Sequence, residues 1–227
     1  MREMFMRSMR TNGGHRRRHA SGFSLIEMVM VMALIIVLAS ITFVSLVPLL
    51  KAQRINNAYN TTLSAMRQAR DNAVSQRTSY KVTFTTAALP ALSTIKVEPT
   101  LAGGFNGAQS TVTYQLPNDV SFSVQAGFPS PGPDSYGVGT TAIDFGYTAN
   151  GGTGTQSVIY FCPDGSSQDA EGTPGTCAGS WDGGVVYIGR PGEFLSARAI
   201  TLWGGTGRVR GWRLYSNGSG GYQWVRQ

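Results

Sequence analysis

Residues 28–50 form an apolar run without a charged side chain, and a single carboxylate, Glu27, stands at its amino-terminal edge. A helix over this run reaches roughly 34 Å, enough to cross the hydrocarbon core of a bilayer. A carboxylate in such a segment is costly and persists where a partner neutralises it. We therefore expect a membrane-spanning helix whose glutamate pairs with an amino group.

The flanks of the run predict its orientation. Arg16, Arg17 and Arg18 precede it, and an excess of arginine keeps that side of a span in the cytoplasm. The end of the run, Pro48 to Lys51, offers no small-residue cleavage site of the secretory type, so we expect the span to be retained. The chain is therefore expected to cross the membrane once, with its carboxyl-terminal part outside the cytoplasm.

The junction Gly22-Phe23-Ser24-Leu25-Ile26-Glu27, followed by the long apolar run, resembles the class III leader junction of type IV pilins and of the pseudopilins of type II secretion. The resemblance implies that prepilin peptidase removes a leader of residues 1–22 after Gly22 and methylates Phe23. It also implies that Glu27 guides assembly with other pilins or pseudopilins. An ordinary signal anchor with a chance glutamate is the alternative.

Removal of residues 1–22 changes the charge of the chain. The full sequence has a net charge of +7, and the leader holds six arginines and one glutamate, which leaves +2 for the mature chain. Both histidines, His15 and His19, leave with the leader, so the mature chain lacks a Ser-His-Asp site and the commonest zinc ligand. We expect no enzyme activity, cofactor or metal.

Cys162 and Cys177 are the two cysteines of the chain. In an oxidising compartment they are expected to form a structural disulfide, and closing a loop of about 16 residues contributes roughly 3 kcal/mol. Asp164, Asp169, Glu171 and Asp182 lie in a Gly/Ser/Thr-rich stretch that is typical of an exposed loop. A calcium site built from the acids within the cysteine loop is a minor alternative.

The pattern beyond the span predicts an α+β fold, with a long N-terminal helix packed on an antiparallel β domain. We expect a transmembrane helix over residues 23–50, an amphipathic helix over 51–78 and a periplasmic β-rich domain over 79–227. The amphipathic helix carries an apolar stripe at intervals of three and four: Ile55, Tyr59, Leu63, Met66, Ala69 and Ala73. Alternating segments predict strands at 80–84, 93–97, 111–114, 120–124, 157–161, 185–188 and 199–202.

The end of the chain is rich in arginine, with five between residues 198 and 227 and no acid. If Gly207-Arg208-Val209-Arg210 is extended, Arg208 and Arg210 share a face about 7 Å apart, close to the spacing of phosphates along a nucleic-acid strand. Arg213 extends this candidate DNA contact, and Trp212, Tyr215, Tyr222 and Trp224 are candidate surfaces for stacking bases. The alternative is a C-terminal β-hairpin with solvated arginines, in which Trp203 and Trp212 complete the core.

The pilin-type start, the helix, the β domain and the segment Gly207-Arg208-Val209-Arg210 together resemble the GspH/FimT family of minor pilins and pseudopilins. The resemblance implies a minor subunit of a type IV pilus or a type II secretion pseudopilus, located in the inner membrane until it assembles. Two functions remain open: a DNA receptor of a transformation pilus and a purely structural secretion component. The expected partners are prepilin peptidase, other pilins, inner-membrane lipid and, in the first case, DNA.

Overall fold

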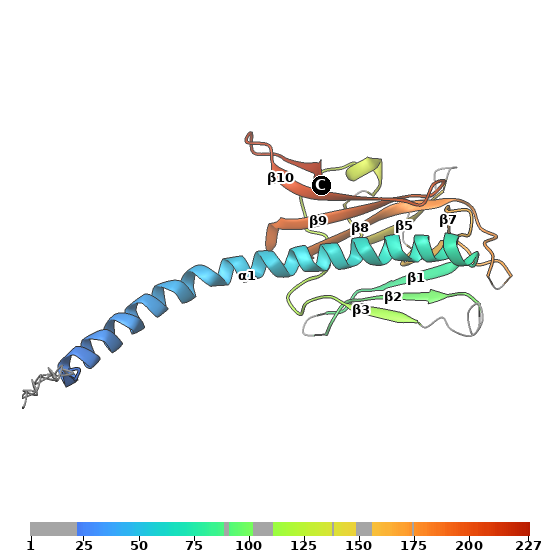
Figure 1. Ribbon diagram of the computed structural model, residues 1–227. Helices are drawn as coiled ribbons and strands as arrows, with labels where there is room; N and C mark the ends of the chain where they lie inside the picture. Colours follow the sequence, from blue (N-terminus) through green and yellow to red (C-terminus); the bar gives the residue numbers. More distant parts are fainter. Residues whose placement is uncertain (1–21, 89–90, 102–110, 138, 149–155, 174) are drawn as a thin grey trace, which may run out of the picture. The chain divides into compact units, whose positions relative to one another are not determined.

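The computed structural model describes residues 22–88, 91–101, 111–137, 139–148, 156–173 and 175–227 (Figure 1). The predicted leader, residues 1–22, lies outside this part except for Gly22. The chain divides into two units, Met1–Leu46 and Val47–Gln227.

One helix, α1 (Leu25–Gln76), contains both the apolar run and the amphipathic segment. Among the described residues it is the one helix long and apolar enough to cross a membrane, and its most apolar window is not buried at all. The helix ends at Gln76 because Arg77 adopts a left-handed conformation with φ of 53°, a common way to stop a helix. The end falls two residues before the predicted boundary at residue 78.

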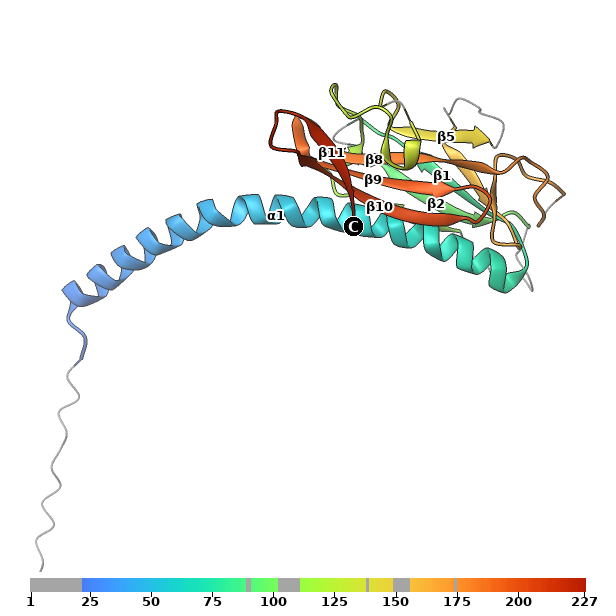
Figure 2. The ribbon, with the colours of Figure 1, turned by 90° about the horizontal axis from the view of Figure 1, so that it is seen from above.

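The second unit contains two antiparallel sheets (Figures 1 and 2). The first has the order β3-β2-β1-β6-β7 and the second the order β11-β10-β9-β8-β4, with β5 paired to β8. The strands of the first sheet are β1 (Tyr80–Thr85), β2 (Thr94–Pro99), β3 (Val112–Gln115), β6 (Val158–Phe161) and β7 (Ser167–Gln168). Those of the second are β4 (Ser121–Phe122), β5 (Ile143–Thr148), β8 (Asp182–Arg190), β9 (Glu193–Trp203), β10 (Arg208–Ser216) and β11 (Tyr222–Arg226). A short 3-10 helix, η2, covers Pro133–Ser135.

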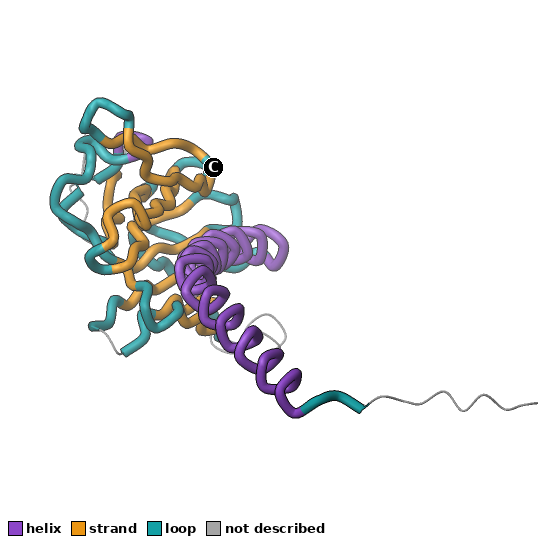
Figure 3. Tube along the Cα trace, turned by 90° about the vertical axis from the view of Figure 1, so that its left-hand side faces the viewer, coloured by secondary structure: helices purple, strands orange, loops and turns teal. Residues whose placement is uncertain are grey.

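The main core joins α1 to both sheets, which lie above and below the helix in Figure 1 and beside it in Figure 3. Most of the predicted helix stripe is buried there, with Met66, Ala69 and Ala73 completely inaccessible to solvent. Leu63 is partly buried against the same cluster. The predicted fold class, a long helix packed on antiparallel β-structure, is confirmed.

The second sheet is buried on its other face as well. There Phe128, Tyr187 and Leu214 form a separate cluster, with Trp212 and Trp224 packed against it. Because both faces are covered, every residue of β8 is buried. The C-terminal alternative, a β-hairpin, is present as β10 and β11.

Cys162 and Cys177 form the predicted disulfide, with 5.9 Å between their Cα atoms. The prediction that the acids near this loop are exposed is wrong for Asp182. That residue begins β8 and has no solvent-accessible surface, because Gly184 lets β5 approach closely and Gly204, in the turn after β9, packs against Asp182 itself. Glu171 and Asp164 are exposed, as expected.

Candidate nucleic-acid interface and N-terminal motif

Two regions carry the predicted functional residues: the start of α1 and the turn between β9 and β10. At the first, Gly22, Phe23 and Ser24 precede the helix, and the carbonyl of Ser24 accepts hydrogen bonds from the amides of Glu27 and Met28 at 3.0 and 3.2 Å. Glu27 lies in the first helical turn, where the helix dipole favours a negative charge. In the described part of the chain its side chain makes no ion pair.

The turn between β9 and β10 requires glycine at residue 207. Gly207 has φ of +57°, and an added Cβ would collide with the carbonyl oxygen of Gly165 and lie 3.0 Å from Nε of Arg70. The Nε group of Arg70 donates to the carbonyls of Gly165 and Thr206, each at 3.2 Å. Arg70 therefore fixes α1 to two turns that are far away in the sequence.

This arrangement brings arginines of the helix and of the C-terminal motif together. A cavity of about 490 Å³ is lined by Arg67 and Arg70 of α1 and by Arg208 at the start of β10, with Asp71 as the acid among its lining residues. Arg67 and Arg208 are exposed and make no ion pair with any residue that the structure describes. Three guanidinium groups against one carboxylate make the cavity suitable for an anion such as phosphate.

Arg210 is held differently from Arg208. Its Nη1 atom forms an ion pair with Oδ1 of Asp134 at 2.7 Å, and Oδ2 of Asp134 accepts the hydroxyl of Thr201 at 2.6 Å. The indole N–H of Trp212 donates to the same hydroxyl at 3.0 Å. Arg210 and Arg208 nevertheless line one smaller cavity of about 220 Å³, together with Trp203. Arg208 is the arginine of the motif that remains free to bind an anion.

The accessible aromatic side chains next to these arginines are not those predicted from the sequence. Trp203 is 47% exposed rather than part of the core, and Trp181 is 55% exposed. With Tyr136 and Tyr147 they line a cavity of about 420 Å³, in which the rings of Tyr136 and Trp203 lie 5.7 Å apart. Trp203 also lines the cavity of Arg208 and Arg210, so a stacking surface adjoins the cations.

The aromatics predicted for stacking have other roles. Trp212 and Trp224 pack in the second cluster, Tyr222 lies against Phe194 with 4.4 Å between ring centroids, and Tyr215 lies 5.0 Å from the guanidinium carbon of Arg213. The structure separates Arg213 from the other motif arginines. Side chains alternate along β10, so Arg213 lies on the same face as the buried Val209 and Gly211, opposite to Arg208 and Arg210. Arg213 also lines a different cavity.

The acids do not assemble into a metal site within the described ranges. No group of three or more His, Cys, Asp and Glu side chains there lies close enough to hold an ion. Asp164 instead accepts hydrogen bonds from the backbone and the hydroxyl of Ser166, which lower the pKa of its carboxyl group.

Comparison with known proteins identifies the N-terminal segment. Residues 17–43 match the family model described as the prokaryotic N-terminal methylation motif. No curated protein and no solved structure matches the chain. The motif implies processing by prepilin peptidase and assembly with other pilins, and with the exposed apolar helix it indicates membrane anchoring. The chain is therefore type IV pilin-like in its N-terminal segment.

Proposed function

We propose that this protein is a minor pilin or pseudopilin that is cleaved between Gly22 and Phe23, methylated on Phe23 and built into a filament through α1. The observation that carries the proposal is the methylation motif over residues 17–43 at the start of a helix whose apolar surface is uncovered. Such a surface requires lipid before assembly and neighbouring helices afterwards. The filament that it joins, a pilus or a secretion pseudopilus, would determine its neighbouring subunits and any exported substrate.

Glu27 would set the axial register between neighbouring subunits in the filament. Cleavage creates an amino group on Phe23, and this group on one subunit would neutralise Glu27 of another within the apolar bundle. Neutralisation removes the cost of an isolated buried charge, so correctly registered subunits are favoured.

The test compares three substitutions in the full chain. Gly22→Ala should leave an uncut precursor, seen as a larger mass, whereas Glu27→Ala should be cut but incorporated poorly into filaments. Glu171→Ala removes an exposed acid of the globular unit and should be cut and incorporated normally. Normal incorporation of Glu27→Ala would refute the pairing of Glu27 with the amino group, and normal cleavage of Gly22→Ala would refute the cleavage site.

A second function, contact with DNA, is favoured by the cavity that Arg67, Arg70 and Arg208 share. Successive phosphates of a nucleic-acid strand would meet Arg208 and the helix arginines, while Trp203 offers an adjoining ring for a base. A mature net charge of +2 favours weak contacts that repeat along a filament. A purely structural secretion subunit is the competing role.

The DNA contact is tested with the full chain in uncharged detergent micelles, by fluorescence anisotropy of a labelled duplex at several salt concentrations. Arg67→Gln with Arg208→Gln should weaken binding and reduce the salt slope by about 0.9 for each lost phosphate contact. Arg226→Gln removes an exposed arginine of β11 outside the cavity and is the control for the loss of one positive charge, to be compared with Arg208→Gln alone as well as with the double variant. If the wild type does not bind DNA at low salt, or if the test and control variants lose the same amount of DNA affinity, the DNA contact is refuted and the purely structural role is favoured.

A further inference from the structure

A cavity of about 730 Å³ lies between α1 and the strands β9, β10 and β11, and it shares no lining residue with the Arg208 cavity. Its walls combine apolar and cationic side chains. Val47, Leu195 and Tyr222 contribute exposed apolar surface, and Lys51 and Arg213 contribute positive charge. A ligand that fills it must be both apolar and anionic.

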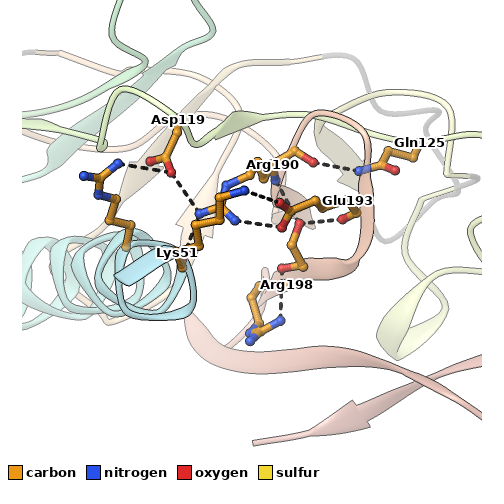
Figure 4. A network of polar contacts seen from close by, with 8 residues as sticks. Lys51, Asp119, Gln125, Arg190, Glu193 and Arg198 are labelled. Carbon is orange, nitrogen blue, oxygen red and sulfur yellow. Dashed lines mark hydrogen bonds and ion pairs between the residues drawn. The ribbon is translucent and has the colours of Figure 1, made fainter. Parts of the chain in front are cut away.

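The cations on one side of the cavity already have carboxylate partners, as Figure 4 shows. Arg190 forms ion pairs with Asp119 at 2.9 Å and with Glu193 at 2.7 Å, and it donates to the carbonyl of Lys51 at 2.8 Å. The ammonium group of Lys51 lies 3.6 Å from the same Glu193 carboxylate. Asp119 also lies 3.5 Å from Arg54, so the two carboxylates are shared among Lys51, Arg54 and Arg190.

Arg198 and Arg213, on the other side, have no carboxylate partner among the described residues. Arg198 is only 4% exposed, and its guanidinium donates to neutral acceptors: the carbonyls of Ser196 and Ala197 at 3.0 and 3.1 Å and the side-chain oxygen of Asn56 at 3.2 Å. The Nε atom of Arg213 is buried and makes no hydrogen bond with the residues that the structure describes. The cavity thus contains two positive charges that no carboxylate of the described ranges balances.

The lack of a carboxylate beside Arg198 has an energetic consequence. Burial, followed by the charge of Arg213, lowers the pKa of Arg198 to about 10, so Arg198 still carries its charge at neutral pH. A buried charge without a counter-charge destabilises the fold. An anion between the two guanidinium groups would offset this cost through charge-assisted hydrogen bonds.

We infer that the cavity binds the phosphate headgroup of an anionic phospholipid. Val47 and Pro48 line it and belong to the apolar run that ends at Leu50, so in a membrane-anchored chain the cavity opens at the boundary between lipid and water. Basic pockets beside membrane spans bind anionic headgroups in other proteins, and the same attraction between arginine and phosphate applies to this cavity. The phosphate would lie between Arg198 and Arg213, with the glycerol and upper acyl chain against the apolar wall. This inference rests on membrane anchoring and not on DNA contact.

The experiment measures lipid bound to the purified full chain by native mass spectrometry in an equal mixture of phosphatidylglycerol and phosphatidylcholine. One phosphatidylglycerol should be retained preferentially, and Arg213→Gln should reduce this preference about tenfold, as expected for the loss of one charge-assisted hydrogen bond. Leu195→Asp, which places a negative charge at the exposed apolar wall, should have the same effect. Arg226→Gln is the control with the same loss of charge.

The thermal unfolding temperature of each variant separates loss of the ligand site from loss of the fold. Reduced phosphatidylglycerol binding by a folded Arg213→Gln protein, with normal binding by Arg226→Gln, supports the site. Equal retention of both lipids by the wild type, or equal losses in Arg213→Gln and Arg226→Gln, overturns it. Glycerol 3-phosphate that binds as tightly as the lipid would reassign the cavity to a soluble phosphate and overturn the lipid proposal, while leaving the filament and DNA tests unaffected.

Discussion

Replacing Asp182 by asparagine should stabilise the protein at neutral pH. The carboxyl group has no solvent-accessible surface; its Oδ1 atom accepts the amide of Gly146 at 2.6 Å, and its Oδ2 atom has no hydrogen-bond partner among the described residues. Burial raises the pKa of Asp182 to about 6. Asparagine keeps an oxygen that can accept the Gly146 amide and carries no charge to desolvate.

The size and sign of the effect follow from the pKa. The difference between about 6 and the ordinary value of 3.8 corresponds to about 3 kcal/mol, at 1.36 kcal/mol per pH unit. Because the folded state binds the proton more tightly than the unfolded state, the wild type loses this stability as pH rises from about 4 to about 6. Asp182→Asn should therefore match the wild type near pH 4 and gain up to about 3 kcal/mol above pH 6.

The assay is denaturant unfolding of the full chain in micelles, followed by tryptophan fluorescence between pH 4 and pH 8. Asp164→Asn is a control of opposite sign, because hydrogen bonds from Ser166 lower the pKa of Asp164. That carboxylate stabilises the fold above its unfolded pKa of 3.8, so Asp164→Asn should lower stability throughout the range from pH 4 to pH 8, and the loss should disappear only in more acidic solution. A gain for Asp182→Asn that does not change with pH, or a loss at pH 7, would refute the role assigned to desolvation.

Three further predictions concern the stability of the fold. Gly211→Ala should destabilise the fold by about 1–3 kcal/mol in denaturant unfolding, because the new methyl group would collide with the hydroxyl of Tyr59. Adding Tyr59→Phe to the same chain should restore part of the loss. If the effects of the two substitutions simply add, this contact is contradicted. Cys162→Ser should cost about 3 kcal/mol relative to the disulfide-bonded wild type, and reduced wild type should unfold like the variant. Met66→Ala, at a fully buried position, should cost about 2–5 kcal/mol by the same assay, and a loss below 1 kcal/mol would contradict its place in the core.

Local patterns were sufficient to predict much of the fold. The stripe of α1 was readable because Met66, Ala69 and Ala73 recur at helical spacing, and their burial follows from that geometry alone. Strands such as β1 and β2 alternate between buried and accessible residues, which also leaves a signal in the sequence. Strand β8 was predicted too short, because burial on both faces removes the alternation and its glycines resemble a loop.

The candidate anion sites depend on contacts between distant segments, which the sequence pattern does not contain. Arg70 reaches Gly165 and Thr206, which are 95 and 136 residues away, so its place beside Arg208 could not be read from spacing. Trp203 ends β9 at an exposed corner, although a tryptophan in a small β domain is usually buried. The one local signal was Gly207, whose left-handed backbone marks a turn that must place Arg208 at its exit.

The arginines near the end of the chain therefore do not form one basic surface. Arg208 meets Arg67 and Arg70 in one cavity, whereas Arg213 meets Arg198 in another, and the ion pair with Asp134 occupies Arg210. If both proposed ligands are real, Arg208→Gln should weaken DNA binding without changing lipid retention, and Arg213→Gln should do the reverse. Loss of both activities in either variant would mean that the two cavities act as a single anionic site, or that β10 as a whole has moved.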